Sequence, residues 1–221
     1  MASTSTVIFD FDGTLVDSFA LAFRLTNEFA RRYGFKQVSE EDIPFCKELP
    51  LRDFIKHLEV PMHKLPVIIA KARAEMRKEI TSIKLFKGMG AALEKLKKAG
   101  LQLGIVTSNS RVNVRECLSF NGVLGHFDFI HSASNLFGKH RILRHLLKKQ
   151  HLSAENVIYV GDEARDIEAS KKCRVPVVAV GWGFQSLKRL RSMNPDFLAS
   201  NPLEIVTFVL ERVSKREKFS K

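Results

Sequence analysis

Five short runs of Val, Ile, Leu and Phe recur along the chain, and their spacing constrains the fold more than any other feature. The runs are Val7–Phe9, Leu103–Val106, Phe129–His131, Val157–Val160 and Val177–Val180. Apolar residues stand mostly at consecutive positions in each run, which is typical of strands covered on both faces of a parallel sheet. Helical patterns separate the later four runs. This alternation predicts an α/β protein with a doubly wound parallel sheet.

The interval between the first two runs is too long for one crossover helix. More than ninety residues separate Phe9 from Leu103, and most of this interval has a helical pattern. The predicted helices cover Phe19–Tyr33, Leu51–Leu58 and Met62–Ile80. We therefore expect a helical domain of about 70 residues, at 17–86, inserted into a core domain formed by 1–16 and 87–221.

Polar residues stand directly after three of the predicted strands. Asp10 and Asp12 follow the first strand, Thr107, Ser108 and Asn109 the second, and Gly161-Asp162 the fourth. In an open parallel sheet the carboxyl ends of the strands share one edge, where ligands bind. Each feature alone has an ordinary interpretation as a turn or a helix cap. Their coincidence at one edge predicts a ligand site there.

Other polar residues nearby have a structural interpretation. Thr14, Asp17 and Ser18 precede a predicted helix and are interpreted as its N-cap residues. For Thr14 the alternative is support of the loop that follows Asp10. Lys139 opens a helix and, taken alone, would be a solvated surface charge. Arg52 near another helix start is a candidate contact for an anionic substrate, and a solvated surface arginine is the alternative.

Charge and cysteine content restrict the class of partner and the compartment. The formal net charge is +12 at pH 7, which favours an anionic partner without identifying it. Three scattered cysteines do not suggest a disulfide framework, and no apolar run reaches the roughly 18 residues of a membrane span. The N-terminus lacks the basic segment of a signal peptide. We expect a cytoplasmic protein with no membrane partner.

Four segments together resemble the signature motifs of the haloacid dehalogenase superfamily. They are DFDGT at Asp10–Thr14, IVTSN with Thr107, Lys139 at a helix start, and VGDEARD with Asp162 and Asp166. The resemblance covers nearly the whole chain. It implies a Rossmann-like core with an inserted helical cap of the C1 type, in the capped branch that includes phosphoglycolate phosphatase and β-phosphoglucomutase.

The resemblance also implies roles for the motif residues. Asp10 would attack phosphorus to form an aspartyl-phosphate, and Asp12 would protonate the leaving oxygen and later deprotonate water. Thr107, the Ser108 amide and Lys139 would bind the phosphoryl group. An acid at Asp12 favours phosphate esters over the substrates of related dehalogenases, which have no acid at this position.

A divalent metal is implied as well. Mg²⁺ would be held by Asp10, the Asp12 backbone carbonyl and Asp162, and would offset the charge of two acids beside a phosphate. Asp166 would lie behind these ligands or act as an alternate ligand. The resemblance thus implies a Mg²⁺-dependent phosphatase acting on a small phosphorylated metabolite, with phosphoglycolate as the best single guess.

Two alternatives remain open from the sequence. One is a phosphosugar mutase of the same family, which would pass the phosphoryl group to another hydroxyl. The other is a nucleic-acid-associated protein or end-phosphatase that uses the basic segments KHRILRHLLKKQH and KRLRS. Few aromatic residues are interleaved with these segments, and no nucleic-acid-binding signature is visible, so we do not expect a nucleic-acid partner. The oligomeric state is not determined by the sequence.

Overall fold

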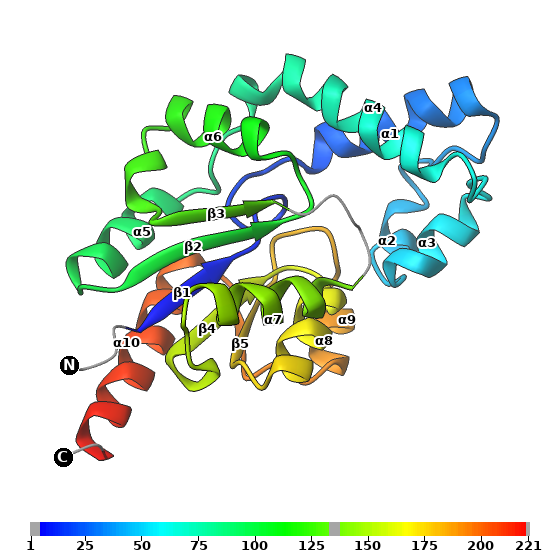
Figure 1. Ribbon diagram of the computed structural model, residues 1–221. Helices are drawn as coiled ribbons and strands as arrows, with labels where there is room; N and C mark the ends of the chain where they lie inside the picture. The colour runs from blue at the N-terminus through cyan, green and yellow to red at the C-terminus, as the bar shows by residue number, and fades with distance from the viewer. Residues whose placement is uncertain (1–4, 133–137, 220–221) are drawn as a thin grey trace.

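Six parallel strands form one sheet in the part of the chain that the computed structural model describes, residues 5–132 and 138–219 (Figure 1). The strands are β1 (Thr6–Phe9), β2 (Gln102–Thr107), β3 (Phe129–Ser132), β4 (Val157–Gly161), β5 (Val177–Val180) and β6 (Phe197–Ala199). Their order across the sheet is β3-β2-β1-β4-β5-β6. The predicted α/β fold with a doubly wound parallel sheet is confirmed.

The central position of β1 brings the polar loops to one place. Phe9, the last residue of β1, pairs with Ile105 of β2 and with Val160 of β4. The chain runs outward from β1 through β2 and β3, and then returns to β4 on the other side of β1. The loops after β1, β2 and β4 therefore meet at the topological switch point, where sheets of this kind bind ligands.

Two layers of helices cover the faces of the sheet (Figure 1). One layer contains α5 (Met89–Lys98), α6 (Arg111–Phe120) and α10 (Pro202–Phe219), and the other contains α7 (Lys139–Lys149), α8 (Ala164–Cys173) and α9 (Leu187–Ser192). Short 3₁₀ turns lie at Ile80–Ser82, Leu124–His126 and Ala154–Asn156.

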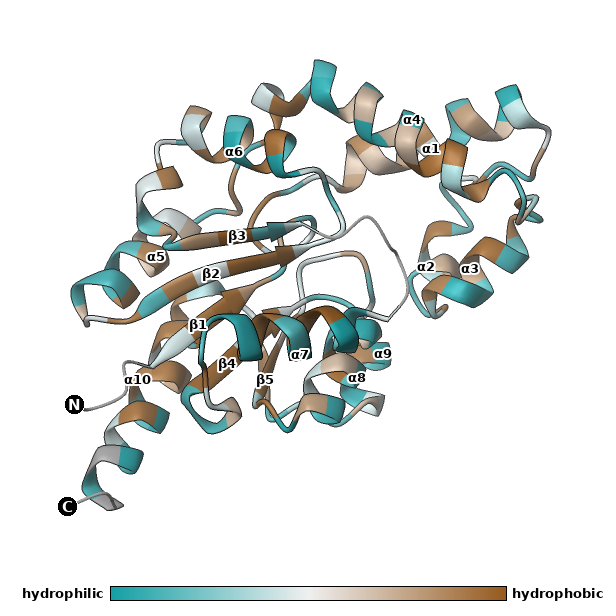
Figure 2. Ribbon diagram, viewed as in Figure 1, coloured by the Kyte–Doolittle hydropathy of each residue, from teal (hydrophilic) through white to brown (hydrophobic). Residues whose placement is uncertain are grey.

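Alternate residues of β1 belong to different cores. Val7 and Phe9 pack with the α5, α6 and α10 layer, whereas Ile8 packs with the α7, α8 and α9 layer. Figure 2 shows the strands as mainly hydrophobic and the surrounding helices as mixed. The apolar runs of the sequence are nearly continuous because each strand needs an apolar side chain on both faces.

Four helices between β1 and β2 form an inserted segment beside the sheet, which we call the cap (Figure 1). They are α1 (Phe19–Tyr33), α2 (Ile43–Cys46), α3 (Leu51–His57) and α4 (Leu65–Lys78). Leu25, Phe29 and Ile68 form a small core that joins α1 to α4. The helical insertion is confirmed, while the domain boundaries at 17–86 stay a prediction.

The cap contacts loops at the carboxyl edge of the sheet in two places. Lys47, just after α2, donates a hydrogen bond from Nζ to the Gly183 carbonyl at 3.1 Å, in the loop after β5. Arg73 of α4 donates to the Ser108 carbonyl in the loop after β2. The cap is therefore docked over the edge at which the predicted site residues lie.

β6 and α10 are not among the elements predicted from the sequence. The three residues of β6 are too few for a recognisable apolar run, and this strand lies at the edge of the sheet beside β5. α10 buries Ile205, Val206 and Val209 in the core. The sheet is thus one strand wider than predicted. Within the described ranges, we find no helix with the length and apolar character needed to cross a bilayer.

Candidate active site

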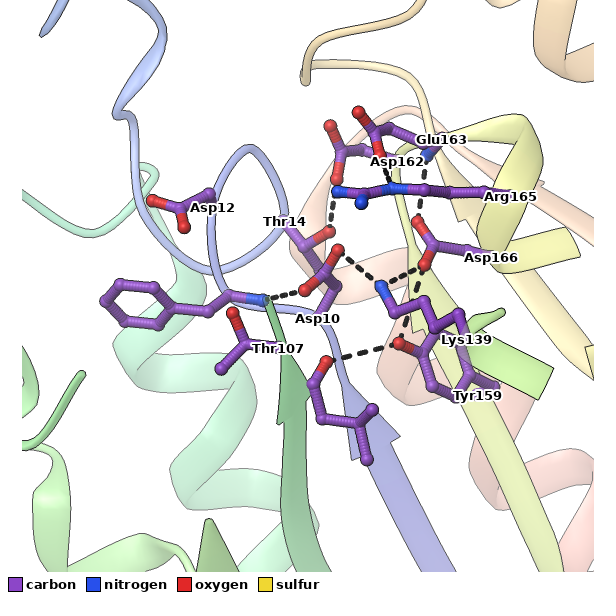
Figure 3. Close-up of polar contacts among 12 residues, drawn as sticks. Asp10, Asp12, Thr14, Thr107, Lys139, Tyr159, Asp162, Glu163, Arg165 and Asp166 are labelled. Atoms are coloured by element: carbon purple, nitrogen blue, oxygen red, sulfur yellow. Dashed lines mark hydrogen bonds and ion pairs between the residues drawn. The ribbon is translucent and has the colours of Figure 1, made fainter. Parts of the chain in front are cut away.

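Asp10 lies at the middle of the carboxyl edge, one residue beyond β1. Its backbone N–H donates to the Val160 carbonyl at 2.8 Å, which continues the pairing with β4. The residue is 3% exposed. Oδ1 accepts the Phe11 N–H at 2.8 Å, and Oδ2 forms an ion pair with Lys139 Nζ at 2.6 Å (Figure 3). A donor on each oxygen therefore holds the carboxylate in one orientation.

Lys139 is the first residue of α7, and its side chain points into the protein. Gly138 precedes it with a φ of 82°, a left-handed conformation that glycine adopts readily. Lys139 Nζ contacts both Asp10 and Asp166. Burial favours the neutral amine, but these two carboxylates outweigh it and hold the pKa of Lys139 well above its usual value. The side chain is a buried ammonium group and not a solvated surface charge.

Asp162, two residues before α8, is enclosed by two other chain segments, at 13–14 and 183–184. Its Oδ1 accepts the Thr14 hydroxyl at 2.7 Å, and its Oδ2 accepts the Phe184 N–H at 2.8 Å. Gly13 and Gly183 approach the carboxylate so closely that a Cβ atom on either one would lie 2.3 Å from Oδ2. Side chains larger than hydrogen at these two positions would displace the carboxylate.

The position of Thr14 corrects one expectation from the sequence. α1 begins only at Phe19, and the buried Thr14 hydroxyl binds Asp162 instead of capping that helix. Ser18 occupies the N-cap position, although its side chain makes no capping hydrogen bond. The N-cap interpretation is therefore wrong for Thr14 and for the exposed Asp17. The hydroxyl of Thr14 finds a better acceptor in a buried carboxylate than in a helix that starts further along.

Three buried carboxylates, those of Asp10, Asp162 and Asp166, bring oxygen atoms within 4.8 Å of one another. Burial raises the pKa of Asp166 to about 6 and the pKa of Asp162 well above its usual value. Their ionised forms therefore need more positive charge than Lys139 supplies. Carboxylate oxygens are hard ligands of the kind that Mg²⁺ prefers, so the cluster fits the predicted metal. Asp166 Oδ1 already forms an ion pair with Lys139, and Asp166 Oδ2 accepts the Glu163 N–H at 3.0 Å.

Asp12 lies apart from this cluster and turns toward the loop after β2 (Figure 3). Its Oδ2 accepts a hydrogen bond from Asn109 Nδ2 at 2.9 Å, and its buried Oδ1 has no hydrogen-bond partner among the described residues. Burial raises the pKa of Asp12 to about 6, against the opposing effect of the Asn109 hydrogen bond. A carboxyl group of this kind can give or take a proton near neutral pH.

Thr107, the last residue of β2, is buried beside Asp10 (Figure 3). Its Oγ1 accepts the Asn109 backbone N–H at 2.9 Å. Because that bond uses the hydroxyl as an acceptor, its hydrogen can be donated to a ligand. Asp10 contacts Lys139, and Thr107 lies at the end of β2, the strand next to β1. Their joint role in binding a phosphoryl group stays a prediction.

Comparison with known proteins identifies the family. A family model described as haloacid dehalogenase-like hydrolase matches residues 7–180. The chain belongs to this family. A phosphoglycolate phosphatase of Synechococcus elongatus is 29% identical over 205 residues, which are 93% of this chain and 97% of the relative. The pyrophosphatase PpaX of Oceanobacillus iheyensis is 24% identical over 210 residues, covering 94% and 97% of the two chains.

Solved structures agree with the family at the level of the fold. The crystal structure of a predicted phosphatase from Clostridium acetobutylicum superimposes with a TM-score of 0.81 at 22% identity, over 95% of this chain and 100% of that one. The resemblance to the haloacid dehalogenase superfamily, which the motifs suggested, is confirmed, and the chain is a hydrolase of that family.

Arg165 is a part of the hydrolase site that the sequence analysis missed. It lies in the first turn of α8, between Asp162 and Asp166, and its Nε forms an ion pair with Glu163. Burial favours the neutral guanidine, but Glu163, Asp10 and Asp166 hold the pKa of Arg165 above its usual value. A cation in the first turn of a helix is unfavourable with the helix dipole. That anomaly within VGDEARD is the signal that could have revealed this residue.

Arg52 and Ser108 lie on the cap side of the site. Arg52, in the first turn of α3, lines a cavity of about 600 Å³ together with Lys139 and Arg165. The cavity separates the cap from the N-terminal ends of α7 and α8. The structure therefore places Arg52 where it could contact a ligand that reaches Lys139. Ser108 has its carbonyl bonded to Arg73 of the cap.

Proposed function

We propose that this hydrolase is a Mg²⁺-dependent phosphatase that cleaves the phosphate ester of a small metabolite through an aspartyl-phosphate on Asp10. The observation that carries the proposal is the buried Asp10 carboxylate, which lies 2.6 Å from Lys139 Nζ at the switch point of the sheet. Phosphoglycolate is the first substrate to test, because the relative with 29% identity is named a phosphoglycolate phosphatase.

In the first step, an Asp10 oxygen attacks phosphorus and the ester P–O bond breaks, while Asp12 transfers its proton to the leaving oxygen. The Thr107 hydroxyl and the Ser108 amide donate hydrogen bonds to the phosphoryl oxygens. Lys139 balances their charge and keeps Asp10 oriented. The burial that raises the pKa of Asp12 to about 6 allows its carboxyl group to hold a proton close to neutral pH.

In the second step, Asp12 is ionised and takes a proton from a water molecule whose oxygen attacks phosphorus. The bond between Asp10 and phosphorus breaks, the carboxylate is restored, and inorganic phosphate leaves. The docked cap excludes other water from the crevice during both steps. The same pair of carboxyl groups therefore serves both halves of the reaction.

Asp10, the Asp12 backbone carbonyl and Asp162 would hold Mg²⁺, with Asp166 behind them or as an alternate ligand. When bound, the ion supplies positive charge that stabilises the phosphoryl oxygens. The Thr14 hydroxyl, 2.7 Å from Asp162 Oδ1, keeps that carboxylate turned toward the cluster.

Phosphate release from a panel of phosphorylated metabolites, with and without Mg²⁺, tests the proposal. We expect release from at least one ester to fall by about 100-fold or more after treatment with EDTA and to return with added Mg²⁺, because the ion contributes several kcal/mol of charge stabilisation. Inorganic pyrophosphate belongs in the panel because of the relative named for that activity. Full activity in metal-free buffer would contradict the metal requirement, and no release from any ester would contradict the phosphatase.

The basic surface motivates a separate test for a nucleic-acid partner. Arg144, Lys148 and Lys149 are exposed on α7, beyond the turn that carries Lys139. Replacing all three by glutamine should change kcat by less than about twofold, because charges outside the site affect the capture of substrate and not the chemical step. Their effect on capture is screened over about 10 Å at 0.1 M salt. The proposal fails if the protein binds labelled RNA or DNA at submicromolar concentration in physiological salt and the triple variant does not.

A further inference from the structure

We propose that Asn109 is a positioning residue for the general acid and base, and that its side-chain amide holds the Asp12 carboxylate in place together with the docked cap. Asn109 stands in the loop after β2, two residues beyond Thr107. The inference rests on the proposed function, because it assigns Asn109 a task toward Asp12 in that reaction. It concerns a residue to which the motif resemblance gave no role.

The contacts of the Asn109 side chain define its orientation. Nδ2 donates to Asp12 Oδ2 at 2.9 Å. Oδ1 accepts two hydrogen bonds, one from the Ser110 N–H at 2.8 Å and one from Asn113 Nδ2 at 3.0 Å. The reversed amide would set its NH₂ group against these two donors. The donor end of Asn109 is therefore forced to face Asp12.

The backbone of Asn109 is held as firmly as its side chain. Its N–H donates to Thr107 Oγ1 at 2.9 Å, and its carbonyl accepts the Ser132 hydroxyl from the end of β3. The residue is 4% exposed. With both ends of the residue fixed, the amide has little freedom to follow a displaced carboxylate, so it sets the position of Asp12 instead.

A purely structural role as a helix cap does not explain this arrangement. Ser110 is the N-cap of α6, and its own Oγ accepts the Asn113 N–H at 3.1 Å. The N-terminus of α6 is thus capped by Ser110 and does not need the side chain of Asn109. The bond to Asp12 adds nothing to the helix, and it joins two loops that are 97 residues apart in the chain.

The same network reaches the cap. Asn113 is buried and uses Nδ2 for two bonds, one to Asn109 Oδ1 and one to the Arg73 carbonyl of α4 at 2.9 Å. Arg73 also contacts the Ser108 carbonyl with its guanidinium group. Docking of α4 therefore supports the amide orientation of Asn109, and through it the position of Asp12. The cap would help to place the acid as well as exclude water.

Two substrates with different leaving groups can distinguish a misplaced Asp12 from a general loss of structure in the variant. In the first step the proton moves from Asp12 to the ester oxygen as the P–O bond breaks. An alkoxide needs that proton, whereas p-nitrophenolate is a stable anion and leaves without it. Both substrates then give the same phosphorylated Asp10, whose hydrolysis again needs Asp12 as a base. Misplacement of Asp12 should therefore affect the first step only for the alkyl ester.

Rapid-quench measurements on the full-length Asn109→Ala variant with Mg²⁺ test the inference. We expect first-turnover cleavage of an alkyl phosphate, phosphoglycolate or whichever alkyl ester the panel identifies, to slow by about 10- to 100-fold, because a misplacement of about 1 Å can cost that much. First-turnover release of p-nitrophenolate from p-nitrophenyl phosphate should change by less than about twofold. Hydrolysis of the phosphorylated enzyme should slow equally for both substrates.

Three further variants complete the test. Asn109→Ser, whose shorter side chain cannot reach Asp12, should reproduce the pattern and replaces Asn109→Ala if that variant does not fold. Adding Asn109→Ala to Asp12→Asn should have no further effect on the alkyl ester, since the two residues act through one contact. Asn121→Ala is the matched control, because this partly buried asparagine bonds the Ile83 and Cys117 carbonyls and not Asp12. It should show no dependence on the leaving group.

The possible failures are distinguishable. Equal slowing of first-turnover cleavage for both substrates in Asn109→Ala, or no slowing of this step for either, would overturn the positioning role while leaving the phosphatase intact. If Asp12→Asn itself shows no dependence on the leaving group, the role of Asp12 in the proposed function is wrong, and the inference falls with it.

Discussion

Replacement of Asp10 by asparagine should lower phosphate release by at least about a thousandfold, since an amide cannot serve as the nucleophile and loss of a nucleophile has effects of this size or larger. The change is nearly isosteric, and Lys139 keeps its contact with Asp166. One negative charge is also removed from a group of buried acids. We therefore expect an intact fold, with a Tm equal to or above that of the wild type.

Asp17→Asn provides the matched control for this experiment. Asp17 is an exposed acid a few residues further along the same loop, so its replacement removes the same charge without touching the crevice. Steady-state phosphate release and thermal unfolding of both variants give the two readings. Turnover above a few per cent of wild type in Asp10→Asn, with the protein folded, would show that Asp10 is not the nucleophile.

Replacement of Lys139 by alanine should lower kcat by about 100- to 1000-fold, the size expected when a buried group that stabilises charge in the transition state is lost. Lys139 Nζ is 2.6 Å from Asp10 Oδ2 and also contacts Asp166. Its removal leaves both carboxylates without this cation, so Tm should fall as well. Activity must be measured well below the Tm of the variant.

Lys148→Ala is the matched control, because it removes a lysine from the same helix at a position outside the site. Lys148 is exposed about two and a half turns beyond Lys139 on α7, and its removal should leave kcat within about twofold of wild type. A loss below tenfold in Lys139→Ala would mean that the phosphoryl group does not depend on this ammonium. The side chain would then have a structural role in joining α7 to β1 and α8.

The five predicted strands were correct because each depends on a local pattern. A strand between two helical layers must be apolar at successive positions, as β1 and β5 are, and a polar residue must follow where the chain leaves the sheet. β6 lacked such a pattern, because three residues at the edge of a sheet carry too little information. The position of the insertion was predictable for a similar reason, since its length cannot fit a single crossover.

The contacts that complete the site could not be predicted in this way. Thr14 meets Asp162 across 148 residues of sequence, although a threonine before a helix is most simply interpreted as its cap. Arg165 was not among the predicted site residues, and its place among acids depends on its burial in the folded chain. Such partners are decided by the order of the strands and the shape of the loops, and neither leaves a periodic signal in the chain.

By itself the sequence determined that a parallel sheet would carry acids at the ends of its strands, because apolar periodicity and strand termination act over a few residues. The tertiary structure alone decided which polar groups are forced together when water is removed. Burial makes an unsatisfied donor or acceptor costly, so Asn109 must aim its amide at Asp12, and Lys139 must lie between Asp10 and Asp166. These choices depend on atoms from distant segments meeting in one crevice, and only the folded chain brings them there.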